Sequence, residues 1–402
     1  MGCLVADQIT ANKTLFADVE ATEGTAATSE SESADAILAS GITFKPALKM
    51  NDRVYQGSPG QRDPIPGAQE GAEVSFTTEL KGNGTTTIPE VDVLLTACFG
   101  SVVAADLDTT ISGAAGSATV LNVAAATNAS NGSLVMLETA TADTYEVLGI
   151  ISASDVAPVP DTITVTPGAV NGGYATAGKK VKEMRTYQIL MPPATNNSVT
   201  LDAYYNANAG AGQRERVVGA RGTFKMDSPR AGAIPSFAWM FKGWSIARLT
   251  SGTRPTPTYD SANPKAAVSS IFRVNSTYTN AFDISFELGA EVALKMSQNS
   301  TTGAYGAPSV SYKPKGSFKI HPAHSSIAEF TAWEAGTAAS ILFQVGNALY
   351  GTWAIFVPRA VRVMVDRVDD GGVQAQQIDW VAAETADALA TAGEAAMYLG
   401  VG

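Results

Sequence analysis

The residues best suited to metal or acid–base chemistry are few and poorly spaced for it. The chain holds two histidines, His321 and His324, in the segment HPAH. Two histidines three positions apart can share a metal ion, but Pro322 interrupts a helix there and no cysteine lies near in sequence. Asp366 and the run DDGG at 369–372 lack the alternating oxygen ligands and closing glutamate of a calcium loop, so a hairpin turn is the simpler interpretation. The sequence therefore predicts no metal site.

Catalytic sets are equally hard to find. No glycine-rich phosphate loop, nucleophile elbow or Ser, His, Asp set is present. The paired acids Glu20 and Glu23 lie in a solvated acidic stretch, where no dry pocket shifts a pKa. Trp239, Phe241 and Trp244 in SFAWMFKGW could form a ligand face, but alternating burial in a strand explains Trp239 and Phe241 as core residues, and we favour that interpretation. We expect a protein that is not an enzyme and uses no cofactor.

Composition points to a large, β-rich protein. The chain has 402 residues, of which 45% are hydrophobic and only 16% charged. That length exceeds what one hydrophobic core usually serves, so more than one core is expected. The formal net charge of −11 argues against a protein that grips nucleic acid, since phosphate binding needs clustered lysine and arginine.

Targeting features are also weak. No run of about 18 apolar residues predicts a membrane span, and the first residues lack the basic start and apolar core of a secretory signal. We therefore expect synthesis in a cytoplasm, without an anchor. Cys3 and Cys98 are the only cysteines, and a disulfide framework is not expected.

The elements that would position functional residues begin at 72–100. Strand-like alternation is carried by Val74, Phe76, Thr78 and Leu80. After a Gly-Asn-Gly break, Pro89 suits the first turn of a helix and Gly100 suits its end. One apolar face of that helix would consist of Val91, Leu94, Leu95 and Cys98. A strand followed by a helix that covers the sheet is the predicted first module.

The rest of the chain suggests an internal repeat with an insertion. Residues 1–40 form an acidic, low-complexity arm that cannot build a core alone, and the arm is either disordered or ordered by a neighbour. Residues 51–71 are predicted as an irregular loop because of their prolines and glycines. Residues 105–182 shift in composition and are predicted as a small inserted β domain. From about residue 269 the pattern starts again, in the same order of strand, loop, strand and helix.

Short matches support the repeat. The sequence ALKM at 47–50 recurs at 293–296, and each copy is followed by a glycine-rich loop. The Ser75-Phe76 strand has a counterpart at Ser317-Phe318, and the helix candidate 89–100 has one in SIAEFTAWEAG at 326–336. We predict two copies of one β module, of which the first is interrupted.

A family resemblance covers residues 15–100 and 185–250 best. VEATEGTAATSESESADAILASG, GAEVSFTTELKGNG, LLTACFG and GARGTFKMDSPRAGAIPSFAWMFKG resemble segments of the tail tube (major tail) proteins of long, non-contractile tailed bacteriophages. Thr96 stands where that family usually has a basic residue, and Phe99 intervenes before Gly100. For the second half of the chain the internal repeat carries the comparison.

The resemblance implies a mainly β fold with two tandem tail-tube β-sandwich or barrel modules, each flanked by a short α-helix, plus the inserted domain. The expected parts are the arm 1–40, the first tube domain 41–104 and 183–258, the outer decoration 105–182, and the second tube domain 259–402. Such tubes usually have six domains per ring, so a two-domain chain is expected to form a homotrimer with pseudo-sixfold symmetry. Ring closure would also remove the sheet edges that are liabilities in a monomer.

By the same resemblance, the chain is a structural virion protein that stacks in rings to form the tail tube. The loop 51–71, with 297–310 as its second copy, is expected to join one ring to the next, and its candidate contact residues are Arg53, Tyr55, Arg62 and Asp63. Expected partners are further copies of the chain and the tape-measure, tail-terminator and baseplate or distal tail proteins, with no membrane. DNA would pass through the lumen without specific binding, aided by the negative charge. The alternative is a secreted or surface β-rich adhesin that binds carbohydrate through the aromatic strand.

Overall fold

The protein is mainly β, as the sequence predicts, with two short α-helices among the residues that the structure describes. The computed structural model describes residues 13–27, 35–53, 62–81, 88–112, 116–155, 160–189, 197–205, 213–228, 230–249, 254–260, 262–264, 266–268, 270–300, 303–323, 326–383 and 396–402. Within these ranges neither helix has the length and apolarity needed to cross a bilayer.

Eight strands form two copies of one four-strand unit. The first unit pairs in the order β3, β4, β15, β14 and the second in the order β19, β24, β27, β26, and every pair is antiparallel. The bounds are β3 Ser40–Arg53, β4 Arg62–Glu79, β14 Gln213–Ser228, β15 Ser236–Gly243, β19 Ala281–Glu287, β24 Lys315–Ile320, β26 Trp353–Asp370 and β27 Val373–Ala382. The identical pairing order is the pattern expected of an internal repeat.

The two units also share an irregularity. β3 and β19 each carry a bulge at a residue with positive φ, which is Gly41 at 64° in β3 and Asp283 at 49° in β19. The motifs that follow are alike, GITF in β3 and DISF in β19. Corresponding cross-strand pairs are Thr43 with Ser75 and Ser285 with Ser317. A bulge kept at the same place indicates that the two units share one register and not only one topology.

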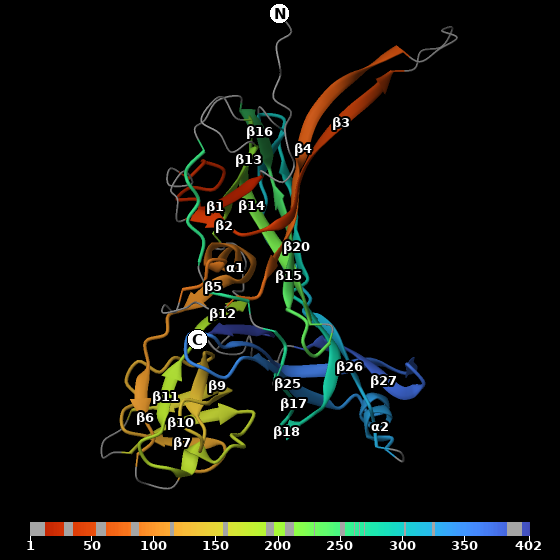
Figure 1. The fold of residues 1–402 in the computed structure, drawn as a ribbon. Coiled ribbons are helices and arrows are strands. Elements are labelled where there is room, and N and C mark those ends of the chain that lie inside the picture. The colour runs from red at the N-terminus through yellow and green to blue at the C-terminus, as the bar shows by residue number, and fades with distance from the viewer. Residues whose placement is uncertain are drawn as a thin grey trace, which may run out of the picture.

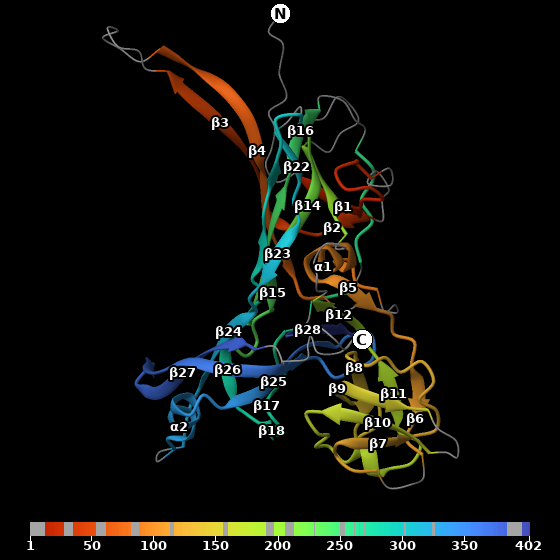
Figure 2. The same cartoon turned by 180° about the vertical axis from the view of Figure 1, so that it is seen from behind.

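The units are joined edge to edge within the chain. β14 of the first unit pairs antiparallel with β19 of the second, with Lys225 opposite Glu287 and Asp227 opposite Ser285. One sheet therefore runs through both units. In Figures 1 and 2, β14 and β15 stand upright in the centre of the molecule, and β26 and β27 cross beneath them.

Residues 51–53 and 62–71 are strand, which corrects the prediction of an irregular loop. β3 and β4 continue past the rest of the sheet as a two-stranded arm that projects from the molecule (Figure 1), with Leu48 opposite Gln69 and Met50 opposite Pro66. Pro64 and Pro66 are tolerated because, apart from a bridge at Gln69, each strand of the ribbon has one edge without a described partner strand, where a missing N–H breaks no ladder bond. Residues 54–61, at the tip, lie outside the described residues.

A second, shorter arm belongs to the second unit. It consists of β20 Ala290–Val292 paired with β23 Ser309–Tyr312 and β21 Lys295–Met296 paired with β22 Ala304–Gly306. The predicted second loop, 297–310, therefore contains β22 and part of β23. This arm lies along the first one, since Gln69 and Gly303 form a parallel bridge. The two ALKM segments lie in corresponding arms. However, more residues separate them along the chain than separate the structurally equivalent Thr43 and Ser285, so the two segments do not occupy equivalent positions.

The described part of the N-terminal segment is ordered by the chain itself, which differs from the predicted acidic arm. β1 (Thr14–Val19) pairs with β13 (Val199–Tyr205) and with β2 (Ala36–Ile37), and β16 (Ser245–Leu249) extends this layer along β14. The side chains of Leu15, Phe16 and Ala17 are almost fully buried. Composition over forty residues concealed this short apolar strand.

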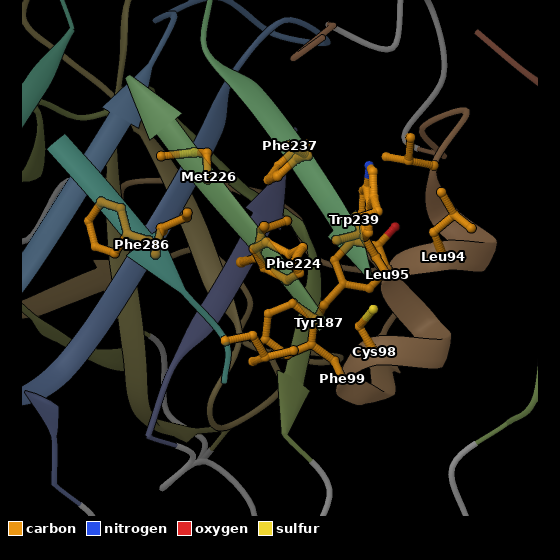
Figure 3. Close-up of a cluster of buried hydrophobic side chains, with 14 of the residues drawn as sticks. Leu94, Leu95, Cys98, Phe99, Tyr187, Phe224, Met226, Phe237, Trp239 and Phe286 are labelled. Atoms are coloured by element: carbon orange, nitrogen blue, oxygen red, sulfur yellow. The ribbon is translucent and has the colours of Figure 1, made fainter. Parts of the chain in front are cut away.

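Helix α1 (Asp92–Phe99) packs between that layer and the first unit. Gly100 ends it in the left-handed conformation, with φ 88°, as predicted. The four predicted face residues, Val91, Leu94, Leu95 and Cys98, are all buried, but so are Ala97 and Phe99. Figure 3 shows Phe99 and Leu95 directed at Tyr187 and Phe224. The helix is thus buried on nearly every side.

The inserted segment builds a six-stranded sheet of its own. Its strands are β6 Asp108–Thr110, β7 Val120–Val123, β8 Leu134–Glu138, β9 Tyr145–Ser154, β10 Asp161–Thr166 and β11 Lys180–Glu183, with a short 3-10 helix at Gly173–Ala175. One face packs on the second unit, where Leu134, Met136 and Tyr145 share an apolar cluster with Phe356 and Tyr398. The insertion is therefore bound to the rest of the molecule through a core, which is more than the predicted decoration requires.

The remaining elements complete the second half of the chain. They are β5 Gly100–Val103, β12 Arg185–Ile189, β17 Ile271–Val274, β18 Thr277–Tyr278, α2 Ala328–Glu334, β25 Ala338–Val345 and β28 Tyr398–Val401. β28 pairs with both β12 and β26, so it joins the strand that follows the insertion to the second unit. α2 lies on β26 with Arg362 bound to Glu329, and none of its residues is fully buried.

Candidate assembly surface

Among the described residues, the side chains with catalytic potential do not converge on one site. His321 stacks on Phe282, with ring centroids 4.7 Å apart, and its Nε2 lies 3.1 Å from the Asp370 carboxylate. Asp370 also accepts from Arg230, and these two partners hold the pKa of Asp370 below its usual value, Arg230 contributing more. His324 lies outside the described residues. Across the described ranges, no group of three or more His, Cys, Asp or Glu side chains could hold a metal ion.

The aspartates beside Gly371 and Gly372 belong to a hairpin turn, as predicted. Both glycines have positive φ, and the Gly372 amide donates to the Asp369 carboxylate at the end of β26. Cys98 is fully buried, which raises the pKa of its thiol well above the usual range. A buried neutral thiol is unreactive, so Cys98 serves packing.

The aromatic strand is part of the core. Trp239 and Phe241 are 1% and 2% exposed, and the Trp239 indole donates to Thr78 Oγ1 at 2.9 Å. Trp244 covers Gly24 and Gly219, where a side chain on Gly24 would overlap the indole ring. Trp239 and Phe241 therefore offer no ligand face.

In the part of the chain that the structure describes, the row of eight strands formed by the two units ends in an edge at β3 and an edge at β26. Among the described residues, β4 is the only strand that pairs with β3, and β27 is the only one that pairs with the last part of β26, from Asp366 to Asp369. Each edge therefore carries backbone groups with no ladder partner in this chain. Such edges are where a further strand can add.

Exposed apolar residues lie beside the first of these edges. On the arm, Leu48, Met50 and Ile65 are 53%, 47% and 48% exposed. Of the predicted contact residues, Arg53 is partly exposed and Asp63 exposed at the base of the tip, the side chain of Arg62 is outside the described set, and Tyr55 lies outside the described residues. A projecting ribbon with apolar side chains in water is an expected contact surface.

Two grooves lie at equivalent places on the two units. The first, of about 310 Å³, is lined by Lys45, Glu73 and Lys242, with Ala290 and Val292 of β20 as its far wall. The second, of about 580 Å³, is lined by Glu287, Lys315, Val381 and the C-terminal Ala396, among others. Tyr312 of β23 also lines the second groove, but none of its described lining residues corresponds to the far wall that Ala290 and Val292 give the first groove.

The solvent face of the continuous sheet carries both signs of charge. Lys225 pairs with Asp227 at 3.0 Å, Lys315 with Glu287 at 3.3 Å, and Lys319 with Asp283 at 2.9 Å. The negative charge of the whole chain is therefore not spread evenly over this face. In each of these pairs the charge of the lysine is largely balanced by the neighbouring carboxylate.

Comparison with protein families finds no family model that matches this chain, and comparison with curated proteins finds no match either. The surfaces described above must therefore be interpreted from their own chemistry. Sequence reasoning found the helix and the aromatic core and expected open sheet edges, but it did not identify which strands form the two edges. Only the pairing order reveals them, because an edge strand and a central strand can have the same alternating pattern.

Proposed function

We propose that this protein is a structural subunit of a bacteriophage tail tube, which polymerises as stacked rings around a channel for DNA. The observation that carries the proposal is the repeated four-strand unit. The chain joins its two units through the β14–β19 ladder, and the described residues leave one unpaired edge at each end of the eight-strand row. A heterologous contact between unlike edges generates rings when the rotation closes. The resemblance of residues 15–100 and 185–250 to tail tube proteins gives that ring its identity.

The number of copies follows from the number of units. Tail tubes of the resembled family usually have six domains per ring, and this chain supplies two equivalent units. Three chains would complete a ring with pseudo-sixfold symmetry. Both arms lie along the same side of the sheet (Figure 1), so three chains would present six arms toward the adjacent ring, three long and three short.

DNA would pass the solvent face of the sheet. Cationic residues on this face are matched by nearby carboxylates, as in the Lys225–Asp227 and Lys319–Asp283 pairs. A phosphate that approached such a lysine would compete with a carboxylate already in place. Each lysine would then attract phosphate only weakly, so DNA could slide along the wall even though the wall is not uniformly negative.

The alternative function, an adhesin that binds carbohydrate, finds no support in a specific feature. The ligand face of such an adhesin would be the strand that contains Trp239 and Phe241, but both side chains are buried. An enzyme would need convergent reactive groups, and the histidine region holds only a surface ion pair.

Electron microscopy of the purified chain over a range of concentrations tests the proposal. We expect rings and, at higher concentration, tubes, and we expect mass measurement on the rings to give three chains each. Images of monomers at every concentration would overturn the tube proposal. Rings of six chains would overturn the trimer and leave the tube in place.

A further inference from the structure

We propose that β3 of one copy adds to the free edge of β26 of the next copy, in the register that the chain already uses between β19 and β14. This inference rests on the proposed function and specifies the contact that closes the ring. It follows from extending the internal repeat by one unit. β19 is the first strand of the second unit and β3 the first strand of the first, whereas β14 and β26 are the last strands of their units.

The register can be carried over rung by rung. In the first unit, Ser75 lies opposite Met240, which lies opposite Thr223. In the second unit, Ser317 lies opposite Asp379, which lies opposite Met364. Thr223 therefore corresponds to Met364, and the residues two positions on, Lys225 and Asp366, also correspond.

The in-chain junction then defines the contact between copies. Within the chain the pairs are Lys225 with Glu287, Met226 with Phe286, and Asp227 with Ser285. The corresponding pairs between copies are Asp366 with Lys45, Arg367 with Phe44, and Val368 with Thr43. All three residues of each strand lie on edges that no described strand covers.

Charge supports this register independently of topology. Across β14, β19 and β24, the junction aligns Lys225, Glu287 and Lys315. Across β26, β3 and β4, the proposed contact aligns Asp366, Lys45 and Glu73, in which every sign is reversed. Opposite charges on adjacent strands stabilise a ladder and like charges destabilise it. The three substitutions are unlike in type but consistent in sign, as expected if opposite charges must face each other on adjacent strands of each junction.

The second groove gives a further point of contact. In the first groove, Ala290 and Val292 form the far wall, and the Ala290 amide donates to Thr223 Oγ1 at 3.2 Å. The repeat places Leu48 and Met50 of the next copy at the corresponding wall of the second groove. Both are about half exposed in the single chain, so closing the groove would remove apolar surface from water. The contact between copies would have one hydrogen bond fewer than the junction within the chain. Pro46, which has no N–H, corresponds to Leu288, whose amide donates to the Phe224 carbonyl.

Disulfide trapping tests the register. In a Cys3→Ser background, Thr43→Cys combined with Val368→Cys would place the two cysteines opposite each other across the proposed contact. Oxidation should link assembled chains into covalent dimers and trimers that reductant separates. The matched control combines Thr43→Cys with Gln374→Cys, which lies on β27, on the other side of β26, and at least about tenfold less cross-linking is expected there.

The outcomes separate this inference from the proposed function. Rings that form without enrichment of the Thr43–Val368 cross-link over the control would overturn the register and leave the tube proposal intact. Absence of rings in the unmodified protein would overturn both.

A second variant tests the same contact in case the double-cysteine variant does not fold. Asp366→Lys changes one exposed side chain and sets like charges opposite each other, so the protein concentration at which rings appear should rise about tenfold. Glu79→Lys makes the same change of net charge at an exposed position away from the contact and should shift that concentration less than about twofold. Equal shifts in the two variants would refute the charge alignment.

Discussion

Glu20 allows a sharp test of how the N-terminal segment is held. Glu20 is 6% exposed, and its carboxylate accepts four hydrogen bonds, two at each oxygen. Oε2 accepts from the Gly24 amide and the Ser198 hydroxyl, both at 2.7 Å, and Oε1 accepts from the Gly219 amide at 2.7 Å and the Thr200 hydroxyl at 2.9 Å. One carboxylate thus joins the segment after β1 to β13 and β14.

Glu20→Gln keeps the size of the side chain and replaces one acceptor oxygen by an NH2 donor. Whichever way the amide turns, it faces one backbone N–H that cannot rotate away, either that of Gly24 or that of Gly219. A bond to a charged group is worth about 1.5–3 kcal/mol, and a buried unpaired amide costs about 1–3 kcal/mol. We expect a local loss of about 3 kcal/mol, which corresponds to roughly a hundredfold faster exchange of protected amides in β1.

Hydrogen exchange followed by mass spectrometry measures this loss in peptides that cover residues 14–24. Glu79→Gln, at an exposed position on β4, is the matched control and should stay within about 0.5 kcal/mol of the unmodified protein. If Glu20→Gln exchanges like the control, the carboxylate does not hold this segment, and the structural role assigned to residues 13–27 is wrong.

Three further outcomes are expected. Arg273→Met should lower the free energy of unfolding in urea by about 3–5 kcal/mol, because it leaves the buried Glu146 carboxylate without its cation, and replacing both residues by apolar ones should cost less. Burial raises the pKa of Asp202 from 3.8 to about 6 against the lowering effect of Arg214, so its contribution to stability is complete below about pH 4 and is lost as pH rises through 6. Asp202→Asn should remove about 3 kcal/mol of that pH dependence in urea unfolding between pH 4 and 7. Deletion of residues 105–182 should cause aggregation in light scattering, since it uncovers Phe356, and adding Phe356→Ser should reduce it.

Local pattern predicted much of the first unit from the sequence. The alternation around Phe76, the helix that ends at Gly100 and the burial of Trp239 all follow from periodicity and end signals of a few residues. The Ser75-Phe76 and Ser317-Phe318 match is in true register, since both serines lie on corresponding rungs. The repeat was visible because equivalent rungs keep equivalent side chains.

The misses have a common physical origin in long-range contacts. β1 is a strand because β13 and β2 flank it, and its acidic surroundings suggested an isolated arm. The prolines of residues 62–71 read as loop because sequence does not show that the ribbon has free edges that accept them. Buried ions such as Arg273 are stabilised by Glu146, which is far away in the chain, and no local window reveals such a pair.

If the proposed contact between copies forms, the reversed charges would make two units in one chain more specific than one unit used twice. If both junctions carried the same signs, β3 of a neighbour could replace β19 on β14, and chains could exchange units or grow without closing. With opposite signs, β3 on β14 would set Lys45 against Lys225, and β19 on β26 would set Glu287 against Asp366. Each wrong pairing places like charges on adjacent strands and loses a favourable pair at the same rung. The junction within the chain and the junction between copies would then alternate around the ring, so only whole chains could close it.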